Sequence, residues 1–480
     1  MKRLLILMLS LCLLLSILVS CNKDTTDKTP TTTTVEEIET EEPDPFEAKD
    51  FGKEVINVLM SVNVANVCYI EEEASNIYEE EIVDTYYITE DKYNVTFEVE
   101  LQPGNGSDGA AFCRRIAAGH DSGANGYEYI VAQAYFAYPL AFQGYYKNLQ
   151  KSDYINLDAE YYYQGMNDNL LVCNQIYGIA GSYNMDKISY QMPVFFNKTI
   201  HESFFAGTEY ANLYDIVKAG NWTLDVMSTL AEGAKLESGD NVWDEKDQYG
   251  FIGVNGSVSA VFASGVEGIS KSDSDEFTVT YYNERLVDIV KDWGEFFNKD
   301  YVLNDGTYNN APLFTSGHAL FYSSHLNTLP SLRADSDFNI GVLPFPKYDT
   351  TQTEYRTHVN RGELIYIPIN ANDEIAGTIV EYMNYQFYKK VVPAYWDSTM
   401  QGRYAATPED RDMMVLTRDS IYDDFAYAYR QEFGDFYIGT HQVITEQKDV
   451  ASYWQQHASN VQTSLDSLLA RFQELESKGN

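Results

Sequence analysis

Val55-Ile56-Asn57-Val58-Leu59-Met60-Ser61-Val62 is a nearly continuous apolar run. Such a run is typical of a strand that is buried on both faces of a parallel sheet. The chain continues with a charged, helix-compatible stretch over 71–91 and an alternating strand over 93–99. A turn-rich loop over 102–109, a short helix over 110–118 and a third strand over 127–131 follow. This succession of strands and helices predicts a parallel α/β sheet.

The rest of the chain repeats the alternation. Further strands are expected over 177–183, 193–198, 249–255, 319–325 and 363–368, and a final helix over 452–475. Another helix is expected to begin within 221–227, where Asn221 or Thr223 can cap it. We interpret Trp222 as a residue that packs this helix in place rather than as a platform for a ligand.

Polar side chains follow two of the expected strands. Ligands of open α/β sheets bind beyond the carboxyl ends of the strands. Ser61 and Asn63 follow the first strand, and Gln133 and Tyr135 follow the third. These four residues are therefore candidates for a ligand site, and ordinary capping of a loop is the alternative for each of them.

The N-terminus carries the features of an export signal. Lys2 and Arg3 precede an apolar run over 4–19 that ends in Leu18-Val19-Ser20-Cys21. This ending resembles a bacterial lipobox, in which the cysteine thiol is acylated, with palmitate for example. We therefore expect a lipoprotein signal peptide over residues 1–20 and lipidation at Cys21. The alternative is an uncleaved anchor that merely contains a cysteine.

Residues 21–50 are expected to form a lipidated, flexible linker. The segment holds the run Thr31–Thr34, several prolines and many carboxylates, but almost no large apolar residues. Such a composition cannot bury enough surface to offset the entropy of ordering the chain. We expect ordered structure from near Phe51, and an extracytoplasmic protein held by its lipid at the outer face of the cytoplasmic membrane.

Charge and motifs exclude several functions. The 33 Lys and Arg residues stand against 72 Asp and Glu residues, a formal net charge of -39, so binding of nucleic acid is not expected. P-loop, GxSxG, HExxH and EF-hand patterns are absent from the sequence. We therefore predict no catalytic residue, no metal site and no cofactor.

Three cysteines remain after Cys12 and Cys21: Cys68, Cys113 and Cys173. No CxxC pair is present in the sequence, so a structural zinc site is not supported. We interpret the three residues as buried free thiols. One disulfide among them is the alternative.

Several stretches, behind the lipobox, together resemble a known family. They are Phe195–Lys198, Leu213–Asp225, Gly317–Phe321, Leu332–Tyr348 and Pro393–Ala405. Their order is similar to that in the extracellular solute-binding proteins of ABC importers, in the large sugar-type branch with clostridial lipoproteins. The sequence departs from the family pattern at Ala406-Thr407-Pro408, where an Arg-Asp pair is common, and at Trp396, where tyrosine is usual.

The resemblance implies a two-lobed α/β periplasmic-binding-protein (Venus-flytrap) fold, type II-like, with lobes joined by crossing strands. Lobe one would hold residues 51–186 plus 370–392, and lobe two would hold 187–369 plus 393–480. The solute would lie between the lobes, which close around it by a hinge motion.

The resemblance also implies which residues contact a sugar. Aromatic rings would stack on the sugar, and polar groups would bond its hydroxyls. The stacking candidates are Tyr135, Tyr183 and Trp396. The polar candidates, each at the end of an expected strand or beside a crossing, are Asn63, Gln133, Asn255, Ser324, His325 and Arg361.

We therefore expect a monomeric, lipid-anchored receptor that captures a carbohydrate, an oligosaccharide first, and hands it to the permease subunits of an ABC transporter. A binding protein for a peptide or another polar solute is an alternative. So are a surface glycoside hydrolase with two cleft carboxylates and a surface adhesin. Release of products from glycans would favour the hydrolase, and a ligand-dependent fall in the radius of gyration would argue against a rigid adhesin.

Overall fold

The computed structural model describes most of the chain after residue 43. The described ranges are 44–64, 67–71, 73–104, 106–121, 126–253, 256–272, 274–304, 310–359, 362–434, 442–446 and 448–478. The chain divides into two units, Met1–Glu47 and Ala48–Asn480, and every element below belongs to the second. The expected signal peptide, Cys21 and the linker as far as residue 43 lie outside the described residues. None of the described helices combines the length and the apolar character that a membrane span requires.

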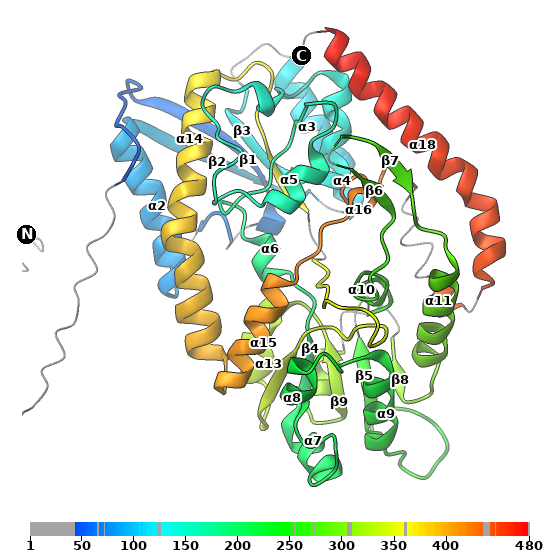
Figure 1. Ribbon diagram of the computed structural model, residues 1–480. Helices are drawn as coiled ribbons and strands as arrows, with labels where there is room; N and C mark the ends of the chain where they lie inside the picture. Colours follow the sequence, from blue (N-terminus) through cyan, green and yellow to red (C-terminus); the bar gives the residue numbers. More distant parts are fainter. Residues whose placement is uncertain are drawn as a thin grey trace, which may run out of the picture. The chain divides into compact units, whose positions relative to one another are not determined.

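The first sheet has four strands in the order β11-β3-β1-β2 (Figure 1). Their bounds are β1 (Glu54–Ser61), β2 (Val95–Gln102), β3 (Tyr129–Gln133) and β11 (Glu363–Tyr366). β1 pairs in parallel with β2 and β3, whereas β11 runs antiparallel to β3. The apolar run Val55–Val62 therefore lies mostly in a central strand, and its Val58, Leu59 and Met60 are fully buried.

Three longer helices accompany this sheet: α2 (Ile77–Tyr93), α3 (Gly109–Asp121) and α14 (Asp373–Gln386). Asn76 begins α2, because its side chain accepts a hydrogen bond from the backbone N–H of Glu79 at 3.1 Å. α14 packs beside α2, where the ring centroids of Tyr93 and Tyr382 lie 5.2 Å apart. We call this sheet and its helices lobe one.

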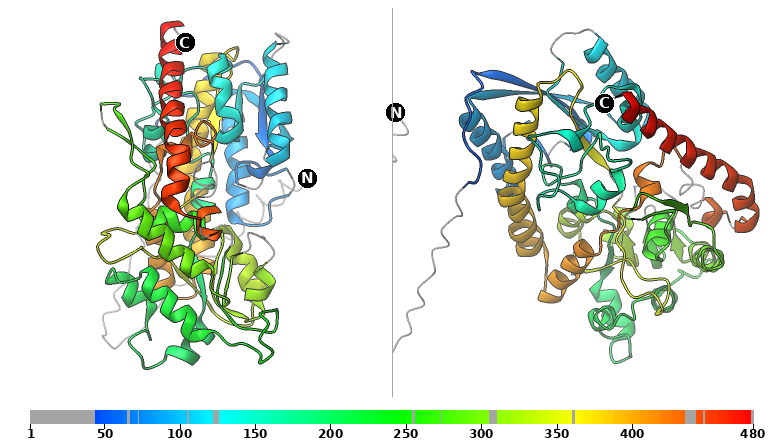
Figure 2. Two further views of the ribbon diagram at one scale, coloured as in Figure 1. Left: turned by 90° about the vertical axis from the view of Figure 1, so that its right-hand side faces the viewer. Right: turned by 45° about the horizontal axis from the view of Figure 1, so that its top comes forward.

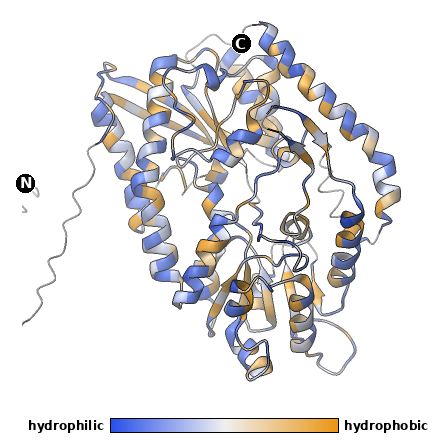
Figure 3. Cartoon of the chain, viewed as in Figure 1, coloured by the Kyte–Doolittle hydropathy of each residue, from blue (hydrophilic) through white to orange (hydrophobic). Residues whose placement is uncertain are grey.

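The second sheet has five strands in the order β10-β4-β9-β5-β8. Their bounds are β4 (Val194–Asn197), β5 (Tyr249–Gly253), β8 (Val302–Leu303), β9 (Ala319–Ser323) and β10 (Ile340–Leu343). β4 is antiparallel to β9 and β10, whereas β5 is parallel to β8 and β9. Figure 3 shows that apolar residues concentrate on the strands of both sheets, as expected for two cores.

Helices surround the second sheet, and together they form lobe two. They are α7 (Lys198–Phe205), α8 (Leu213–Lys218), α9 (Leu224–Ala234), α10 (Gly256–Ala263), α11 (Glu284–Phe297), α12 (Ala311–Thr315) and α13 (Leu329–Ala334). Trp222 precedes α9, is fully buried, and donates from Nε1 to the Pro344 carbonyl at 2.9 Å. The prediction that it packs the helix is confirmed.

Shorter helices, a hairpin and the C-terminal helices complete the chain. The short helices are α4 (Ala134–Ala137), α5 (Gln164–Leu170), α6 (Asp186–Ser189) and α16 (Phe425–Ala428), and the hairpin consists of β6 (Ile269–Lys271) and β7 (Phe277–Val279). Two π-helices, Phe387–Val391 and Ala394–Tyr404, precede α15 (Pro408–Asp419), and the last helix is α18 (Val450–Lys478). The 3₁₀ turns are Val62–Val64, Gly106–Asp108, Tyr138–Gln143, Leu149–Lys151 and Leu326–Thr328.

The C-terminal helix α18 packs against parts of both lobes (Figure 2). Near its end, the Phe472 ring lies 5.1 Å from Phe142, and its carbonyl accepts from the Gln175 side chain at 2.9 Å. Near its start, Trp454 stacks on Tyr282 with ring centroids 5.6 Å apart.

The structure corrects two expectations about strands. The expected strand over 177–183 is an irregular segment with single bridges, such as Ile179 to Ile365. Its glycines admit close neighbours instead, because a Cβ on Gly181 would lie 2.1 Å from the Asn384 side chain. Residues 363–366, expected in lobe two, form β11 of the lobe-one sheet, since the chain crosses between the lobes before this strand and not after it.

The three remaining cysteines are free. Cys68 is buried, and Cys113 and Cys173 are half-buried. The interpretation as free thiols is confirmed for all three, and full burial holds for Cys68 alone.

Asp410 joins α15 to lobe two. Its carboxylate is fully buried and accepts hydrogen bonds from Lys198 Nζ at 2.9 Å, Tyr214 OH at 2.5 Å and the Val342 N–H at 3.3 Å. These donors come from α7, α8 and β10, so one side chain holds three elements together.

We predict that Asp410→Ala lowers the free energy of unfolding by about 3 kcal/mol, because it leaves the partly buried Lys198 ammonium and the Tyr214 hydroxyl without their acceptor. Asp412→Ala is the matched control on the same helix, since the Asp412 pair with Lys218 is exposed and contributes little. Urea unfolding followed by circular dichroism measures both changes. Equal effects of the two substitutions would contradict the role assigned to Asp410.

Candidate functional site

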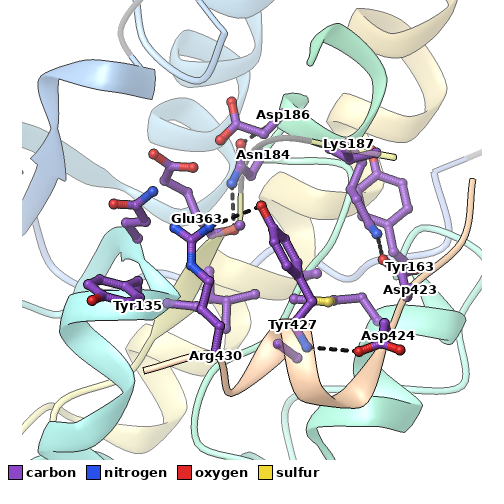
Figure 4. Close-up of a pocket in the computed structure, with 18 of the residues that line it drawn as sticks. Tyr135, Tyr163, Asn184, Asp186, Lys187, Glu363, Asp423, Asp424, Tyr427 and Arg430 are labelled. Atoms are coloured by element: carbon purple, nitrogen blue, oxygen red, sulfur yellow. Dashed lines mark hydrogen bonds and ion pairs between the residues drawn. The ribbon is translucent and has the colours of Figure 1, made fainter. Parts of the chain in front are cut away.

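A pocket lies where the end of β3, α10, two crossing segments and the segment 422–430 meet. It encloses about 740 Å³, open space at its mouth included. The volume that the centre of a water molecule can occupy inside it is about 40 Å³, so the pocket is narrow in this structure. Figure 4 shows its labelled side chains converging from several elements. The lining residues are Gln133, Ala134, Tyr135, Tyr163, Met166, Ala180, Gly181, Asn184, Asp186, Lys187, Phe262, His358, Val359, Gly362, Glu363, Leu364, Tyr422, Asp423, Asp424, Tyr427, Ala428 and Arg430.

Two chain segments cross between the lobes and form the back of the pocket. The Met192 N–H donates to the His358 carbonyl at 3.0 Å, and Gln191 forms a β-bridge with Val359. Nearer to lobe one, Asn184 Nδ2 donates to the Glu363 carbonyl at 2.7 Å. The crossing segments 184–193 and 357–363 are thus bonded to one another, which fixes the side chains that they carry into the pocket.

A third segment is attached to this pair. The Thr357 N–H donates to the Ser420 carbonyl at 2.7 Å, and the Tyr422 N–H donates to the Thr357 carbonyl at 3.1 Å. Asp424 then begins α16, where its Oδ1 accepts from the Tyr427 N–H at 2.9 Å and its Oδ2 accepts from the Gly268 N–H at 3.0 Å. This cap places Tyr427 and Arg430 in the pocket.

Tyr427 and Arg430 span the pocket from one lobe to the other. The Arg430 guanidinium lies over the Tyr135 ring, 4.9 Å from its centroid, and Nη1 donates to Tyr427 OH at 3.0 Å (Figure 4). The Tyr427 ring in turn meets Phe262 of α10 edge to face, with centroids 5.2 Å apart. Tyr135 belongs to lobe one and Phe262 to lobe two, so this chain of contacts couples the two lobes.

The pocket also holds buried charge. Lys187 forms an ion pair with Asp423, and both side chains are largely buried. Burial lowers the pKa of Lys187 below its usual range, whereas the contact with Asp423 favours the charged ammonium. Asp186 and Glu363 are 2% and 3% exposed. Together with Arg430 they give the pocket a strongly polar wall beside its aromatic one.

His358 lies on a crossing segment and is 2% exposed. Its ring stacks on Phe262, with centroids 4.6 Å apart and planes 5° apart. Burial, together with the positive charges of Arg430, His325 and Lys187, lowers the pKa of His358 to about 3. The imidazole is therefore neutral at ordinary pH.

Two of the residues proposed from the sequence line this pocket, and six do not. Gln133 and Tyr135 are lining residues, at the end of β3. Ser61 is buried at the end of β1, where its Oγ accepts from Asn63 Nδ2 at 2.8 Å. The six candidates that lie elsewhere are Ser61, Asn63, Tyr183, Ser324, His325 and Trp396. Asn255 and Arg361 lie outside the described residues.

Trp396 and His325 have aromatic or cationic neighbours of their own. Trp396 is 2% exposed, and the Arg418 guanidinium lies 5.0 Å from its ring centroid. His325 meets the Tyr190 ring at 5.0 Å. Their role as ligand contacts stays a prediction.

Tyr183 does not line the pocket, which corrects the expectation that it stacks on a ligand. It is fully buried in lobe one, and its hydroxyl is within hydrogen-bond distance of Tyr86 OH at 2.6 Å and of Tyr129 OH at 2.9 Å. Because both neighbours already use the hydroxyl, and the ring packs on Phe387 at 4.9 Å, Tyr183 stabilises the core.

Sequence reasoning missed most of the lining. Asn184 directly follows the expected strand 177–183, so the strand-end rule could have found it. Nothing in the sequence points to Tyr427 and Arg430, because they follow no strand and reach the pocket through the cap at Asp424.

No family model matches this chain, and no curated protein matches it either. Among solved structures, the sugar-binding protein MalE of Xanthomonas citri has a TM-score of 0.60 at 12% identity, over 88% of this chain and 99% of that one. A solute-binding protein of an ABC transporter from Thermotoga lettingae, bound to α-D-tagatose, has 0.56 at 14% identity, over 86% and 100%. Lmo0181 of Listeria monocytogenes, in complex with cycloalternan, has 0.55 at 12% identity, over 86% and 99%.

The fold is therefore the two-lobed α/β fold of the solute-binding proteins of ABC transporters, as the resemblance in the sequence predicted. Both of its sheets are mixed. MalE of Xanthomonas citri and the Thermotoga lettingae protein are structural neighbours at low identity, and the likeness to them establishes this fold.

Acid should lower the stability of the wild-type chain more than that of the His358→Phe variant. The pKa of His358 is about 3 in the folded chain, whereas an unperturbed histidine, as in the unfolded chain, has a pKa of 6.5. Between these values the unfolded chain binds the extra proton, so stability falls as the pH drops from 6.5 towards 3. We expect a steeper fall of Tm in wild type than in the variant across this window, measured by circular dichroism. Parallel Tm profiles would show that His358 is not held neutral.

Proposed function

We propose that this protein is the solute-binding component of an ABC transporter and that it captures a carbohydrate, an oligosaccharide first, in the pocket between its lobes. The observation that carries the proposal is the composition of the pocket. Five aromatic rings line it, beside amide, carboxylate and guanidinium groups. Aromatic faces suit the apolar faces of a sugar, and the polar groups suit its hydroxyls. The aromatic lining residues are Tyr135, Tyr163, Phe262, Tyr422 and Tyr427.

Capture would follow from contacts to both lobes. A ligand that touches Tyr135 on one side and Phe262 on the other binds the closed arrangement better than an open one. It therefore shifts the population towards closure by a hinge motion at the crossing segments. The closed monomer would then be recognised by the permease subunits of the transporter.

The ligands of the structural neighbours support a carbohydrate. One is bound to α-D-tagatose, one to cycloalternan, and the GacH receptor of Streptomyces glaucescens, with a TM-score of 0.56 at 12% identity over 86% of this chain and 99% of that one, was solved with acarbose. Two of these neighbours are binding proteins, and the third is a receptor. We accordingly propose binding without turnover, and we keep a glycoside hydrolase and a peptide-binding protein as the competing functions that the experiments below separate.

A thermal-shift screen of residues 22–480 against mono- and oligosaccharides, peptides and amino acids tests this function. A sugar at a hundred times its Kd should stabilise the fold by about 2.7 kcal/mol, which moves Tm visibly. We expect a shift with one family of oligosaccharides and no change in that sugar after incubation. Shifts with peptides alone would contradict the carbohydrate assignment, and released products would indicate a hydrolase.

Tyr427→Ala should abolish the shift, because it removes a ring that faces the pocket and the partner of Arg430. Tyr87→Ala is the matched control, since Tyr87 is 65% exposed on α2, and should keep the shift. Loss of the shift in both variants would indicate general destabilisation.

We further propose that Cys21 carries the lipid that anchors the mature protein to the outer face of the cytoplasmic membrane. The lipobox-like Leu18-Val19-Ser20-Cys21 supports this proposal. In the native host or another lipoprotein-processing bacterium, wild type should incorporate labelled palmitate and partition into detergent, and Cys21→Ser should do neither. Cys68→Ser is the control for a thiol elsewhere in the chain. Incorporation that persists in the Cys21→Ser variant would overturn the anchor.

A further inference from the structure

The side chain of His358 is fixed from three sides. Its ring stacks on Phe262 at 4.6 Å and meets the edge of Tyr427 at 5.2 Å. Its Nδ1 lies 3.3 Å from Ser259 Oγ of α10. Its backbone carbonyl accepts from Met192, on the other crossing segment. The ring therefore has one orientation at the junction of the two lobes.

One atom of this ring has no partner. Among the residues that the structure describes, Nε2 of His358 is buried and makes no hydrogen bond. The residue lines the interlobe pocket and is 2% exposed. A buried polar atom without a partner is unfavourable in a folded protein, and an ordered water, an ion or a group of a ligand can complete the bond.

His201 shows what a buried histidine with a structural role looks like in the same chain. It is 7% exposed and packs on Phe205, with ring centroids 5.7 Å apart. Its Nε2 bonds to the Tyr210 carbonyl at 2.9 Å, so its ring nitrogen is satisfied within the chain. His358 has the same kind of packing without that bond. Packing alone would be served equally well by an apolar ring.

The chemistry of Nε2 indicates what the partner is. The Ser259 hydroxyl can donate to Nδ1, which leaves Nε2 as a donor, or accept from Nδ1, which leaves Nε2 as an acceptor. A neutral imidazole can switch between these forms. A hydroxyl group is complementary to both, because it donates and accepts, whereas a carboxylate only accepts and an ammonium only donates.

We infer that His358 is a specificity-determining contact of the interlobe pocket and that its Nε2 exchanges a hydrogen bond with a hydroxyl group of the bound ligand. The inference rests on the proposed function and deepens it. It assigns an uncharged, hydroxyl-bearing group of the carbohydrate to this corner of the pocket, between Phe262 and Tyr427.

Isothermal titration of His358→Phe tests the inference, because phenylalanine keeps a ring against Phe262 and removes both ring nitrogens, Nε2 and the Nδ1 that faces Ser259. The probes are maltotriose, cycloalternan and α-D-tagatose. We expect the Kd of a sugar that wild type binds to rise about tenfold or more, the change that one lost hydrogen bond produces. His358→Asn, which retains a donor and an acceptor on a shorter side chain, should recover part of the affinity.

His201→Phe is the matched control, and its Kd should equal that of wild type. If His358→Phe does not fold, the His358→Asn titration is read together with ¹⁵N spectra of the wild-type histidines, in which the sugar should shift the Nε2 resonance of His358.

The outcomes separate the two proposals. Binding by wild type with an unchanged Kd in His358→Phe overturns the role of His358 and leaves the carbohydrate function standing. An unmoved Nε2 resonance on binding has the same meaning. Absence of binding by wild type to all three sugars overturns the inference together with the carbohydrate function on which it rests.

Discussion

The pairing of two crossing segments is the constraint on which the described pocket depends. Met192 bonds to His358, Gln191 bridges Val359, and Asn184 bonds to Glu363. These backbone and side-chain bonds hold the two crossing segments together as one unit. The lining residues that the described parts of these segments carry are thereby held in place.

The pocket adds contacts from both lobes to this frame. Asp424 uses its two carboxylate oxygens to begin α16 and to bind the Gly268 backbone. The cap orients Tyr427 towards Phe262 and Arg430 towards Tyr135. Closure and the composition of the site are therefore linked, because the groups that would touch a ligand are the same groups that connect the lobes. A ligand that binds them also stabilises the closed arrangement.

The sequence predicted the fold far better than the site. The run Val55–Val62 and the alternation of strands and helices after it predict β1, β2 and β3. A strand that is buried on both faces is an apolar run, and such a run can be recognised within a single segment of the sequence. Gln133 and Tyr135 follow from the same rule. Tyr183 was wrong as a pocket residue, because a sequence does not show that its hydroxyl meets Tyr86 and Tyr129 in a core. Tyr427 and Arg430 reach the pocket through contacts between segments far apart in the chain, which no local pattern records.

Hydrogen exchange of the mature chain, with and without a sugar that binds it, tests most directly that this pocket is the carbohydrate site. We expect the sugar to slow exchange in peptides that cover 133–135, 180–187, 357–364 and 422–430, and to leave exchange on the outer face of α2 unchanged. Protection that leaves these peptides unchanged and falls elsewhere in the chain would contradict it.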